Sequence, residues 1–376
     1  MTNKNKKKIL FCDNTLWGLV NFRGDVIGHF RDTGHDVVLV APEREDKQMR
    51  IELPEGVRYI PVEMGRTKTN PLNDMKYFLR LVRIFRKERP DFVFNFTIKP
   101  NIYGSIAAKL ARCHVTAMMA GLGYTFKHKT AGTAIARRLY GFGLTFADEL
   151  FLLNADNKRT ITGMGLCKEE KIILLDGGEG INLDKFRMRD NSSDSTTFIF
   201  IGRILWEKGY DEFARAAAIV KERHPQCQFR VLGALDPSYP KSVPPERIKA
   251  DEEAGVLKYL GFTNDMNSIY SQKGIVITLP SYYGEGLNRS LMEACATGKP
   301  IITTDIAGCR ETVEDGKNGY LVAIKDAEAL AEAMEKYIAL PQEAKRLLSL
   351  NSRRLAERKF DIRHVIDAYE NIVNKG

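Results

Sequence analysis

The order of β-rich and helical segments constrains the fold of this chain of 376 residues more than any other feature. Short runs of β-branched and aromatic residues alternate with helical patterns, once in the N-terminal half and again in the C-terminal half. This alternation predicts parallel strands joined by crossover helices. We expect strands at 8–12, 36–40, 58–62, 91–96, 115–119 and 150–153, and then at 198–201, 229–232, 256–260, 275–279, 301–303 and 320–322.

The length exceeds what one hydrophobic core comfortably holds, so two α/β domains with Rossmann-like topology are expected. Glycine and small polar residues cluster at 176–180 and 191–195, which predicts the linker between them. Ligands of open parallel sheets bind beyond the carboxyl ends of the strands, so the expected active site is a cleft between the two domains. A last helix is expected over 361–374.

Composition excludes several classes of protein. No apolar run approaches the ~20 residues that span a bilayer, and residues 1–8 are basic and polar with no signal-like apolar segment behind them. We therefore expect a cytoplasmic protein. The six cysteines are scattered without CxxC pairs, which favours reduced thiols over disulfides or a zinc site. No metal site is expected.

The positive charge is concentrated in the N-terminal half. Residues 1–190 hold 32 Lys and Arg against 22 Asp and Glu, or +10, whereas residues 191–376 hold 25 against 26, or −1. Such an asymmetry predicts an anionic partner for the first domain.

The segment 74–89 combines this charge with helical periodicity and reads as a basic amphipathic helix. It fits a crossover helix whose apolar face packs on the sheet, and it also fits a helix that rests on acidic lipid headgroups. Nucleic acid is disfavoured as a partner because no recognisable reader motif is present. The apolar positions are Met75, Phe78, Leu79, Val82 and Phe85, and the basic positions are Lys76, Arg80, Arg83 and Lys87.

The two domains differ in the loop after their first strand. Residues 13–23 lack GxGxxG, which argues against a nicotinamide or flavin dehydrogenase. In the second domain, Gly202 follows the strand, and Arg203 and Lys208 are placed to face one anion. Most isolated pairs of cations with this spacing are solvated surface charges. Here the position at a strand's carboxyl end favours contacts to a diphosphate, where charge-assisted hydrogen bonds are strong.

Two glutamates with seven residues between them follow the strand at 275–279. Glu285 falls at the strand-to-helix turn, and Glu293 falls in the second turn of a helix that begins near Asn288 and stops at 298–300. The carboxylates are then separated by up to ~12 Å along the helix axis. This is the reach from a ribose to a sugar across a diphosphate, and the helix start at 287–290 adds N–H donors for phosphate.

These motifs together resemble the retaining GT-B glycosyltransferases of family 4, and the resemblance covers nearly the whole chain. It rests on 202–203 with 207–209, the two glutamates, 298–300, and the junction segment 178–186. The resemblance implies the GT-B fold, α/β with two Rossmann-like domains facing across a cleft and a C-terminal helix crossing back to the first. The implied domains are 1–185 for the acceptor, 186–358 for the nucleotide sugar, and the helix 359–376.

Segments 21–23, 97–104, 121–124 and 304–311 resemble bacterial members that build capsule, O-antigen or glycoprotein glycans on polyprenyl diphosphate carriers. The resemblance implies a UDP-sugar donor carrying an N-acetylhexosamine or hexose, and a polyprenyl-diphosphate-linked acceptor. It also implies a peripheral enzyme on the anionic inner face of the cytoplasmic membrane, with no cofactor, no metal and no nucleic acid.

The resemblance assigns roles residue by residue. Arg203 and Lys208 would hold the diphosphate, Glu285 the donor sugar and Glu293 the ribose. Phe262 would lie by the base, although a core position fits it equally well. The other donor residues implied are Gly202, Gly286, Leu287 and Asn288. The acceptor residues implied are Gly18, Asn21, Arg23, Lys99, Asn101, Gly121, Gly123, Tyr124 and His128.

The chain departs from the family in two informative places. No histidine occurs at 94–99, where many relatives carry one, so no general base is named. A front-face retaining mechanism, in which the leaving phosphate takes the acceptor's proton, needs none. Asn288 stands where relatives carry proline, and it could cap the helix instead.

Other functions are consistent with parts of the sequence. A GT-B-shaped epimerase would use the same fold, while a phosphorylase would need a pyridoxal-phosphate lysine that no motif marks. A non-enzymatic basic adaptor for membrane or nucleic acid would need only the charged first half. Such an adaptor would keep its function in the variants Lys208→Ala and Glu285→Ala, whereas a transferase would lose turnover.

Overall fold

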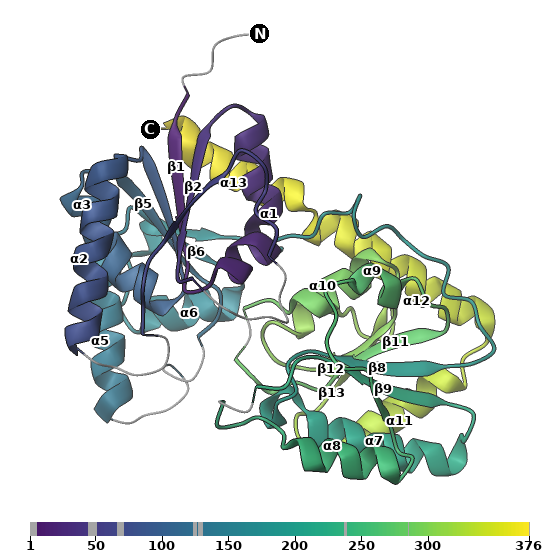
Figure 1. Cartoon of the computed structure of the whole chain (residues 1–376). Coiled ribbons are helices and arrows are strands. Elements are labelled where there is room, and N and C mark those ends of the chain that lie inside the picture. Colours follow the sequence, from purple (N-terminus) through teal and green to yellow (C-terminus); the bar gives the residue numbers. More distant parts are fainter. Residues whose placement is uncertain are drawn as a thin grey trace. The chain divides into compact units, whose positions relative to one another are not determined.

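The computed structural model describes residues 6–43, 51–65, 71–122, 126, 131–236, 239–284 and 286–375. The chain forms two compact units, one of Met1–Glu179 with Ile362–Gly376 and one of Gly180–Asp361. Figure 1 shows one parallel sheet with helices in each unit. The predicted α/β class with two Rossmann-like domains is confirmed.

The first unit is built on a seven-stranded parallel sheet with the order β3-β2-β1-β4-β5-β6-β7. The order reverses at β1, where Phe11 pairs with Leu39 on one side and with Phe94 on the other. This reversal is the switch point at which doubly wound folds place their ligands. The strands are β1 (Lys8–Cys12), β2 (Asp36–Ala41), β3 (Arg58–Pro61), β4 (Phe92–Phe96), β5 (His114–Met119), β6 (Glu149–Leu152) and β7 (Ile172–Leu174).

Helices cover both faces of this sheet. One face packs against α1 (Leu16–Asp32) and α13 (Ile362–Lys375). The other face packs against α2 (Pro71–Glu88), α3 (Ser105–Leu110) and α5 (Ala131–Thr145), which Figure 1 shows as one group. The unit also contains a turn of π-helix at Pro100–Gly104, α6 (Ala155–Gly163) and a short 3-10 turn at Glu169–Lys171.

The last helix, α13, completes the core of the first unit. Its apolar residues recur at helical spacing and are buried. Tyr369 sits at the centre of this contact, with its ring 4.7 Å from that of Phe94 and 4.9 Å from that of Phe151. The final residues are therefore part of the first unit's core, although they follow the second unit in sequence.

The second unit repeats the plan with a six-stranded parallel sheet of order β10-β9-β8-β11-β12-β13. Its strands are β8 (Thr197–Ile201), β9 (Gln228–Leu232), β10 (Lys258–Tyr259), β11 (Ile275–Leu279), β12 (Ile301–Thr304) and β13 (Gly319–Val322). Its helices are α7 (Tyr210–Arg223), α8 (Pro245–Glu253), α9 (Met266–Tyr270), α10 (Arg289–Ala296), α11 (Ala327–Ile338) and α12 (Gln342–Leu355). Shorter 3-10 turns lie at Trp206–Lys208 and Arg310–Thr312, and a π-helical turn lies at Ala356–Phe360.

The division between the units falls at Glu179 and again at Asp361, whereas the sequence predicted boundaries after 185 and 358. The reason is the packing of the segment that starts the second unit. Ile181 is fully buried in the core of that unit, and its N–H donates to the carbonyl of Phe360 at 2.6 Å. This contact assigns both connecting segments to the second unit.

Helix α2, which follows β3 and precedes β4 in the chain, packs on the sheet as the crossover-helix interpretation predicts, but its buried face is displaced from the predicted one. Its buried residues are Asp74, Tyr77, Leu81 and Phe85, and Tyr77 reaches the thiol of Cys12 under the sheet. Of the five predicted apolar positions, Phe85 is buried and Phe78 and Val82 pack against the same core. Met75 and Leu79 are exposed together with Leu72.

None of the helices in the described part of the chain is long and apolar enough to cross a membrane.

Candidate active site

In the second unit, the loops after β8 and β11 lie together at the carboxyl edge of the sheet. Tyr282 donates its backbone N–H to the carbonyl of Glu207 at 2.9 Å, and the hydroxyl of Ser281 also approaches this carbonyl. These contacts join the loop that carries the two predicted cations to the loop that leads to the glutamates. The loop of the two cations therefore packs against the start of the loop after β11.

Gly209 makes this approach of the two loops sterically feasible. Its φ is +84°, and a Cβ added there would collide with the backbone carbonyl of Pro280. Only glycine adopts this conformation and leaves room for the second loop. The glycine that closes the predicted phosphate loop thus has a defined steric role.

Arg203 and Lys208 both lie beside the ring of Tyr283. The Arg203 guanidinium is 5.5 Å and the Lys208 ammonium 5.3 Å from the ring centroid. Arg203 is exposed, whereas Lys208 is only 7% exposed. The two cations therefore lie beside the same aromatic side chain.

A second tyrosine extends this aromatic support. The ring of Tyr239 lies 5.4 Å from the Arg203 guanidinium, and the side chains of Tyr239 and Tyr283 are hydrogen-bonded to each other. Burial, and then the neighbouring Tyr283, raise the pKa of Tyr239 to about 12. The Tyr239 phenol is therefore expected to stay neutral at physiological pH and to orient Arg203 rather than act as a base.

Helix α10 begins as the sequence suggested. Asn288 is its N-cap, and its side chain accepts a hydrogen bond from the N–H of Leu291. The backbone N–H of Asn288 donates to the carbonyl of Gly308 at 2.9 Å, which ties this loop to the one after β12. The side chain of Ser290 bridges the cap and the carbonyl of Ile201. The start of α10 is therefore fixed against the end of β8.

Glu293 lies on this helix and is 6% exposed. Its Oε1 accepts from the Arg289 Nε at 2.9 Å, and its carboxyl is also hydrogen-bonded with the hydroxyl of Tyr270. Burial raises the pKa of Glu293 above its ordinary value of 4.5, although Arg289 and Tyr270 offset part of this effect. The carboxylate is held in one orientation, as a hydroxyl acceptor must be.

This raised pKa predicts a pH-dependent effect on stability. A folded-state pKa above 4.5 means that the folded state binds the proton more tightly than the unfolded state. Glu293 therefore costs stability progressively as the pH rises above about 4.5. In Glu293→Gln this cost is absent, so the melting temperature of the variant relative to the wild type should increase from acidic to neutral pH. A difference that does not change with pH, measured by calorimetry, would contradict a raised pKa.

The remaining donor residues are placed less completely. Gly286, Leu287 and Gly202 lie in the loops just described, with Gly286 and Leu287 buried. Phe262 follows β10 and is half-buried, so it is not the enclosed core aromatic that one interpretation suggested. Glu285 falls outside the described residues.

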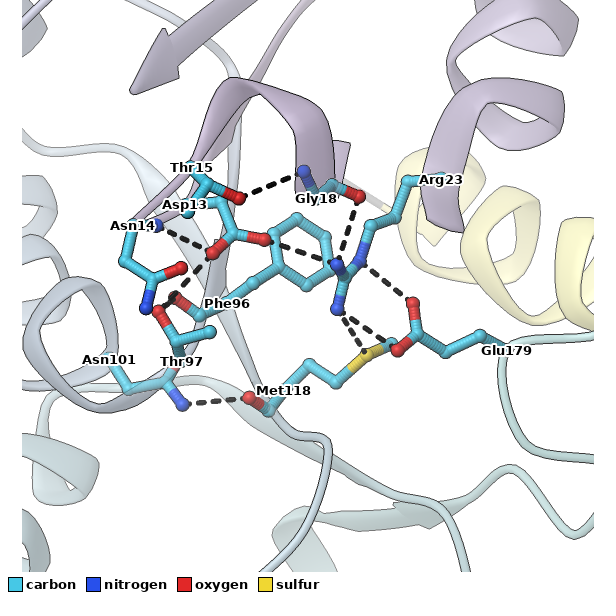
Figure 2. A network of polar contacts seen from close by, with 10 residues as sticks. All are labelled: Asp13, Asn14, Thr15, Gly18, Arg23, Phe96, Thr97, Asn101, Met118 and Glu179. Carbon is cyan, nitrogen blue, oxygen red and sulfur yellow. Dashed lines mark hydrogen bonds and ion pairs between the residues drawn. The ribbon is translucent and has the colours of Figure 1, made fainter. Parts of the chain in front are cut away.

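In the first unit, a buried ionic network occupies the carboxyl edge at the switch point (Figure 2). Arg23 lies between two carboxylates, with its Nη1 3.1 Å from Asp13 Oδ2 and its Nε 2.8 Å from Glu179 Oε2. The same guanidinium donates to the carbonyl of Gly18 at 3.2 Å and stacks on Phe96 at 4.3 Å. Arg23 is 4% exposed, so its contacts favour a structural role over the predicted contact to the acceptor.

Asp13 and Thr97 close this network on the side of β4. Asp13 is 1% exposed and its Oδ1 accepts from the backbone N–H of Asn14 and the hydroxyl of Thr97. Thr97 has a φ of +67°, which is a strained conformation for a β-branched residue. Strain of this kind costs about 1–3 kcal/mol and clusters at functional sites. The sequence assigned a role to neither residue. Thr97 opens the segment 97–104 that resembles relatives, but its contact with Asp13 is formed only in the tertiary structure.

The other predicted acceptor residues are distributed over several environments. Asn101 is buried, and its amide donates to the carbonyl of Met118 and the hydroxyl of Tyr140, both at 2.7 Å. This favours a structural role for Asn101. Lys99 pairs with Asp74 at 2.7 Å. Of the rest, Gly18 is buried at the start of α1, Asn21 is exposed on α1 and Gly121 is half-buried, while Gly123, Tyr124 and His128 fall outside the described residues.

Within the described ranges, no group of three or more His, Cys, Asp or Glu side chains gathers in a way that could hold a metal ion.

Comparison with known families accounts for both units. Residues 184–354 match the family model described as glycosyl transferases group 1, and residues 8–154 match the model described as glycosyl transferase 4-like. Two Rossmann-like units with this pair of matches define a GT-B glycosyltransferase. The chain belongs to the group 1 glycosyltransferases and has a glycosyltransferase 4-like N-terminal part.

Curated relatives match over most of the chain. An N,N'-diacetylbacillosaminyl-diphospho-undecaprenol α-1,3-N-acetylgalactosaminyltransferase of Campylobacter jejuni is 28% identical over 343 residues, which is 86% of this chain and 88% of the relative. A UDP-Gal:α-D-GlcNAc-diphosphoundecaprenol α-1,3-galactosyltransferase of Escherichia coli is 24% identical over 338 residues, or 85% of this chain and 84% of the relative.

Solved structures show the same fold. A glycosyltransferase from Rickettsia africae superposes with a TM-score of 0.78 at 18% identity, covering 99% of this chain and 98% of the other. The HepE protein of Anabaena, solved with UDP and glucose, superposes with a TM-score of 0.78 at 16% identity, covering 98% and 100% of the two chains.

Proposed function

We propose that this glycosyltransferase moves a sugar, an N-acetylhexosamine or hexose, from a UDP-sugar to a saccharide carried on a polyprenyl diphosphate. The convergence of Arg203 and Lys208 on Tyr283 carries the donor half of this proposal. The names of the Campylobacter and Escherichia relatives support the acceptor half, since both act on undecaprenyl-diphosphate-linked sugars. The product would be a longer lipid-linked saccharide for the assembly of bacterial surface or glycoprotein glycans.

The two cations would act on the leaving group. As the bond between the anomeric carbon and the diphosphate oxygen breaks, negative charge builds on that oxygen, and fixed cations stabilise it without reorganising. The acceptor hydroxyl would bond to the same face of the anomeric carbon and give its proton to the departing phosphate. This front-face route retains configuration and requires neither a metal nor a protein base.

The two glutamates would bind hydroxyls. Glu293 would accept from the ribose, since its carboxylate is already oriented by Arg289 and Tyr270. Glu285 would accept from the donor sugar. Donor binding tests this assignment directly, because a ligand that binds only the folded state raises the melting temperature. UDP should stabilise the wild type and stabilise Glu293→Gln much less; no stabilisation of either protein by UDP would contradict the assignment.

We further propose that the first unit works at the anionic inner face of the cytoplasmic membrane. Two of its helices present apolar side chains to solvent beside basic ones. On α2 these are Leu72, Met75 and Leu79, and on α5 they are Ile135, Leu139 and Phe142. Exposed Lys76 and Arg83 accompany the first stripe and exposed Arg138 the second, and α5 contains no acidic residue. Apolar side chains flanked by cations match the interface of an acidic bilayer.

Removal of the apolar stripe on α5 should weaken membrane binding. The variant Leu139→Gln/Phe142→Gln is expected to lose about tenfold or more of its partitioning onto vesicles that contain phosphatidylglycerol, because each buried apolar side chain contributes on the order of 1 kcal/mol or more. Co-flotation with vesicles measures this. The matched control is Ile324→Gln/Leu347→Gln, which removes two exposed apolar side chains from the second unit. Equal losses in both variants would contradict a specific membrane face.

A further inference from the structure

A second basic site lies in the first unit, at the amino edge of its sheet. The loops after β1 and β4 lie at the opposite, carboxyl edge of the same sheet. A cavity of about 630 Å³ opens at the amino edge between the ends of two helices and the starts of three strands. Lys7 precedes β1, Asp91 precedes β4 and His114 opens β5, and all three line the cavity. Substrates of such sheets bind at the carboxyl edge, so this cavity at the amino edge is separate from the site of sugar transfer.

The cavity concentrates positive charge. Arg86, Arg89 and Arg112 line it, and Asp91 is the acidic residue in its lining. Asp91 is already engaged, because its Oδ2 accepts from the backbone N–H of Lys8 at 2.7 Å. Across the described ranges of the chain, none of the three guanidinium groups forms an ion pair. Together with Lys7, four cationic side chains line this one cavity. Like charges around one cavity repel one another, and a bound anion would offset that repulsion.

The backbone at two of these arginines is strained. Arg89 and Arg112 have φ values of +48° and +61°, and each directly follows the end or the C-cap of a helix, α2 for Arg89 and α3 for Arg112. Helices commonly end in this left-handed conformation, but glycine or asparagine normally supplies it. Arginine gains nothing there from its backbone preference. An arginine thus occupies an unfavourable left-handed backbone conformation twice, at two positions that line the same cavity.

A simpler account explains part of this pattern. Basic residues near helix C-termini interact favourably with the helix dipole. That effect explains why arginines occur near the ends of α2 and α3. It does not explain why Arg89 and Arg112 take a backbone conformation that favours glycine, or why three arginines without an ion pair in the described ranges line one cavity.

We propose that this cavity binds a phosphate group, with Arg89 and Arg112 as its main donors. Guanidinium groups bind phosphate oxygens in pairs, which suits a site built from arginines rather than lysines. The phosphate belongs either to the headgroup of an acidic phospholipid or to a free phosphorylated compound. Exposed Leu110 also lines the cavity, and it would contact the apolar part of a lipid.

The test uses the full-length protein and two probes, inorganic pyrophosphate in a thermal-shift titration and vesicles of phosphatidylcholine with or without phosphatidylglycerol. Three variants are compared with the wild type. Arg89→Gly/Arg112→Gly removes both guanidinium groups and relieves the strained backbone, while Arg89→Gln/Arg112→Gln removes the charge alone. Arg346→Gln/Arg354→Gln removes two exposed charges from the second unit as a matched control.

The proposal expects each cavity variant to bind at least one probe about tenfold or more weakly than wild type, with the control unchanged. The glycine variant should also melt at a higher temperature than the glutamine variant when no probe is present. Loss with pyrophosphate identifies a free ligand, and loss with phosphatidylglycerol vesicles alone identifies a lipid. A different result would overturn the proposal: Lys208→Met abolishes pyrophosphate binding, whereas the cavity variants keep it and bind vesicles as the wild type does. That result would place the anion in the donor site. The proposal would also be overturned if the wild type bound neither probe, whether or not it binds UDP.

Discussion

Replacement of Lys208 by methionine is expected to lower kcat/KM for sugar transfer by roughly 100- to 1,000-fold, the loss typical when one preorganised charge is removed from a developing anion. Methionine keeps the apolar stem that packs in this buried position, so the fold should be retained. Arg203→Gln should lose activity to a similar degree. Because both cations lie beside Tyr283, their effects should not be additive in the double variant.

The control for this prediction is Lys249→Ala, which removes an exposed lysine of the same unit that pairs only with Glu253 on its own helix in the described structure. Steady-state release of UDP measures the effect, and circular dichroism confirms the fold. If Lys208→Met folds and keeps turnover within threefold of wild type, the assignment of Lys208 to the leaving group is wrong.

Replacement of Arg23 by methionine is expected to destabilise the first unit by about 3–5 kcal/mol, because it leaves the buried carboxylate of Asp13 without its cation. In a unit of this size each kcal/mol lowers the melting temperature by roughly 2–4 °C. Arg23→Lys should recover only part of the loss, since one ammonium cannot reach Asp13, Glu179 and the carbonyl of Gly18 together.

The pH dependence of the Arg23→Met variant gives a second readout. Burial raises the pKa of Asp13 even in the presence of Arg23, and without the cation the pKa should rise further. A raised pKa costs stability as the pH rises, so the deficit of the variant should be smaller at acidic pH than at neutral pH. Arg31→Met, at the solvent-accessible end of α1, is the control and should cost little. A deficit for Arg23→Met no larger than that of the control would contradict the ionic network.

The sequence predicted the fold almost completely because periodicity and turn chemistry are local properties. The limits of β1 and β11 agree with the prediction, and those of β8 and β12 differ by one residue. The expectation that Asn288 caps α10 is confirmed. The short edge strand β7 (Ile172–Leu174) was missed because three residues give too little alternation to detect.

The site was less predictable because side-chain partners are set by tertiary structure. Arg23 reads as an available cation in the segment 21–23, and nothing nearby in sequence indicates that Glu179 pairs with it. Tyr239 and Tyr283 support Arg203 from loops after different strands. On α2, the prediction assigned Met75 and Leu79 to the sheet, but Tyr77 and Leu81 occupy that position. Apolar residues recur at helical spacing on both the buried and the exposed face of α2. Periodicity alone therefore does not tell which of the two faces packs on the sheet.

The most direct test of the proposed function is release of UDP by the purified full-length protein with a panel of UDP-sugars and undecaprenyl-diphosphate-linked saccharides. We predict release with at least one UDP-N-acetylhexosamine or UDP-hexose, strictly dependent on the lipid-linked acceptor and lost in Lys208→Met. The transferred sugar should appear on the lipid with its anomeric configuration retained. Absence of release with every pair of donor and acceptor, from protein that is folded by calorimetry, would contradict the account.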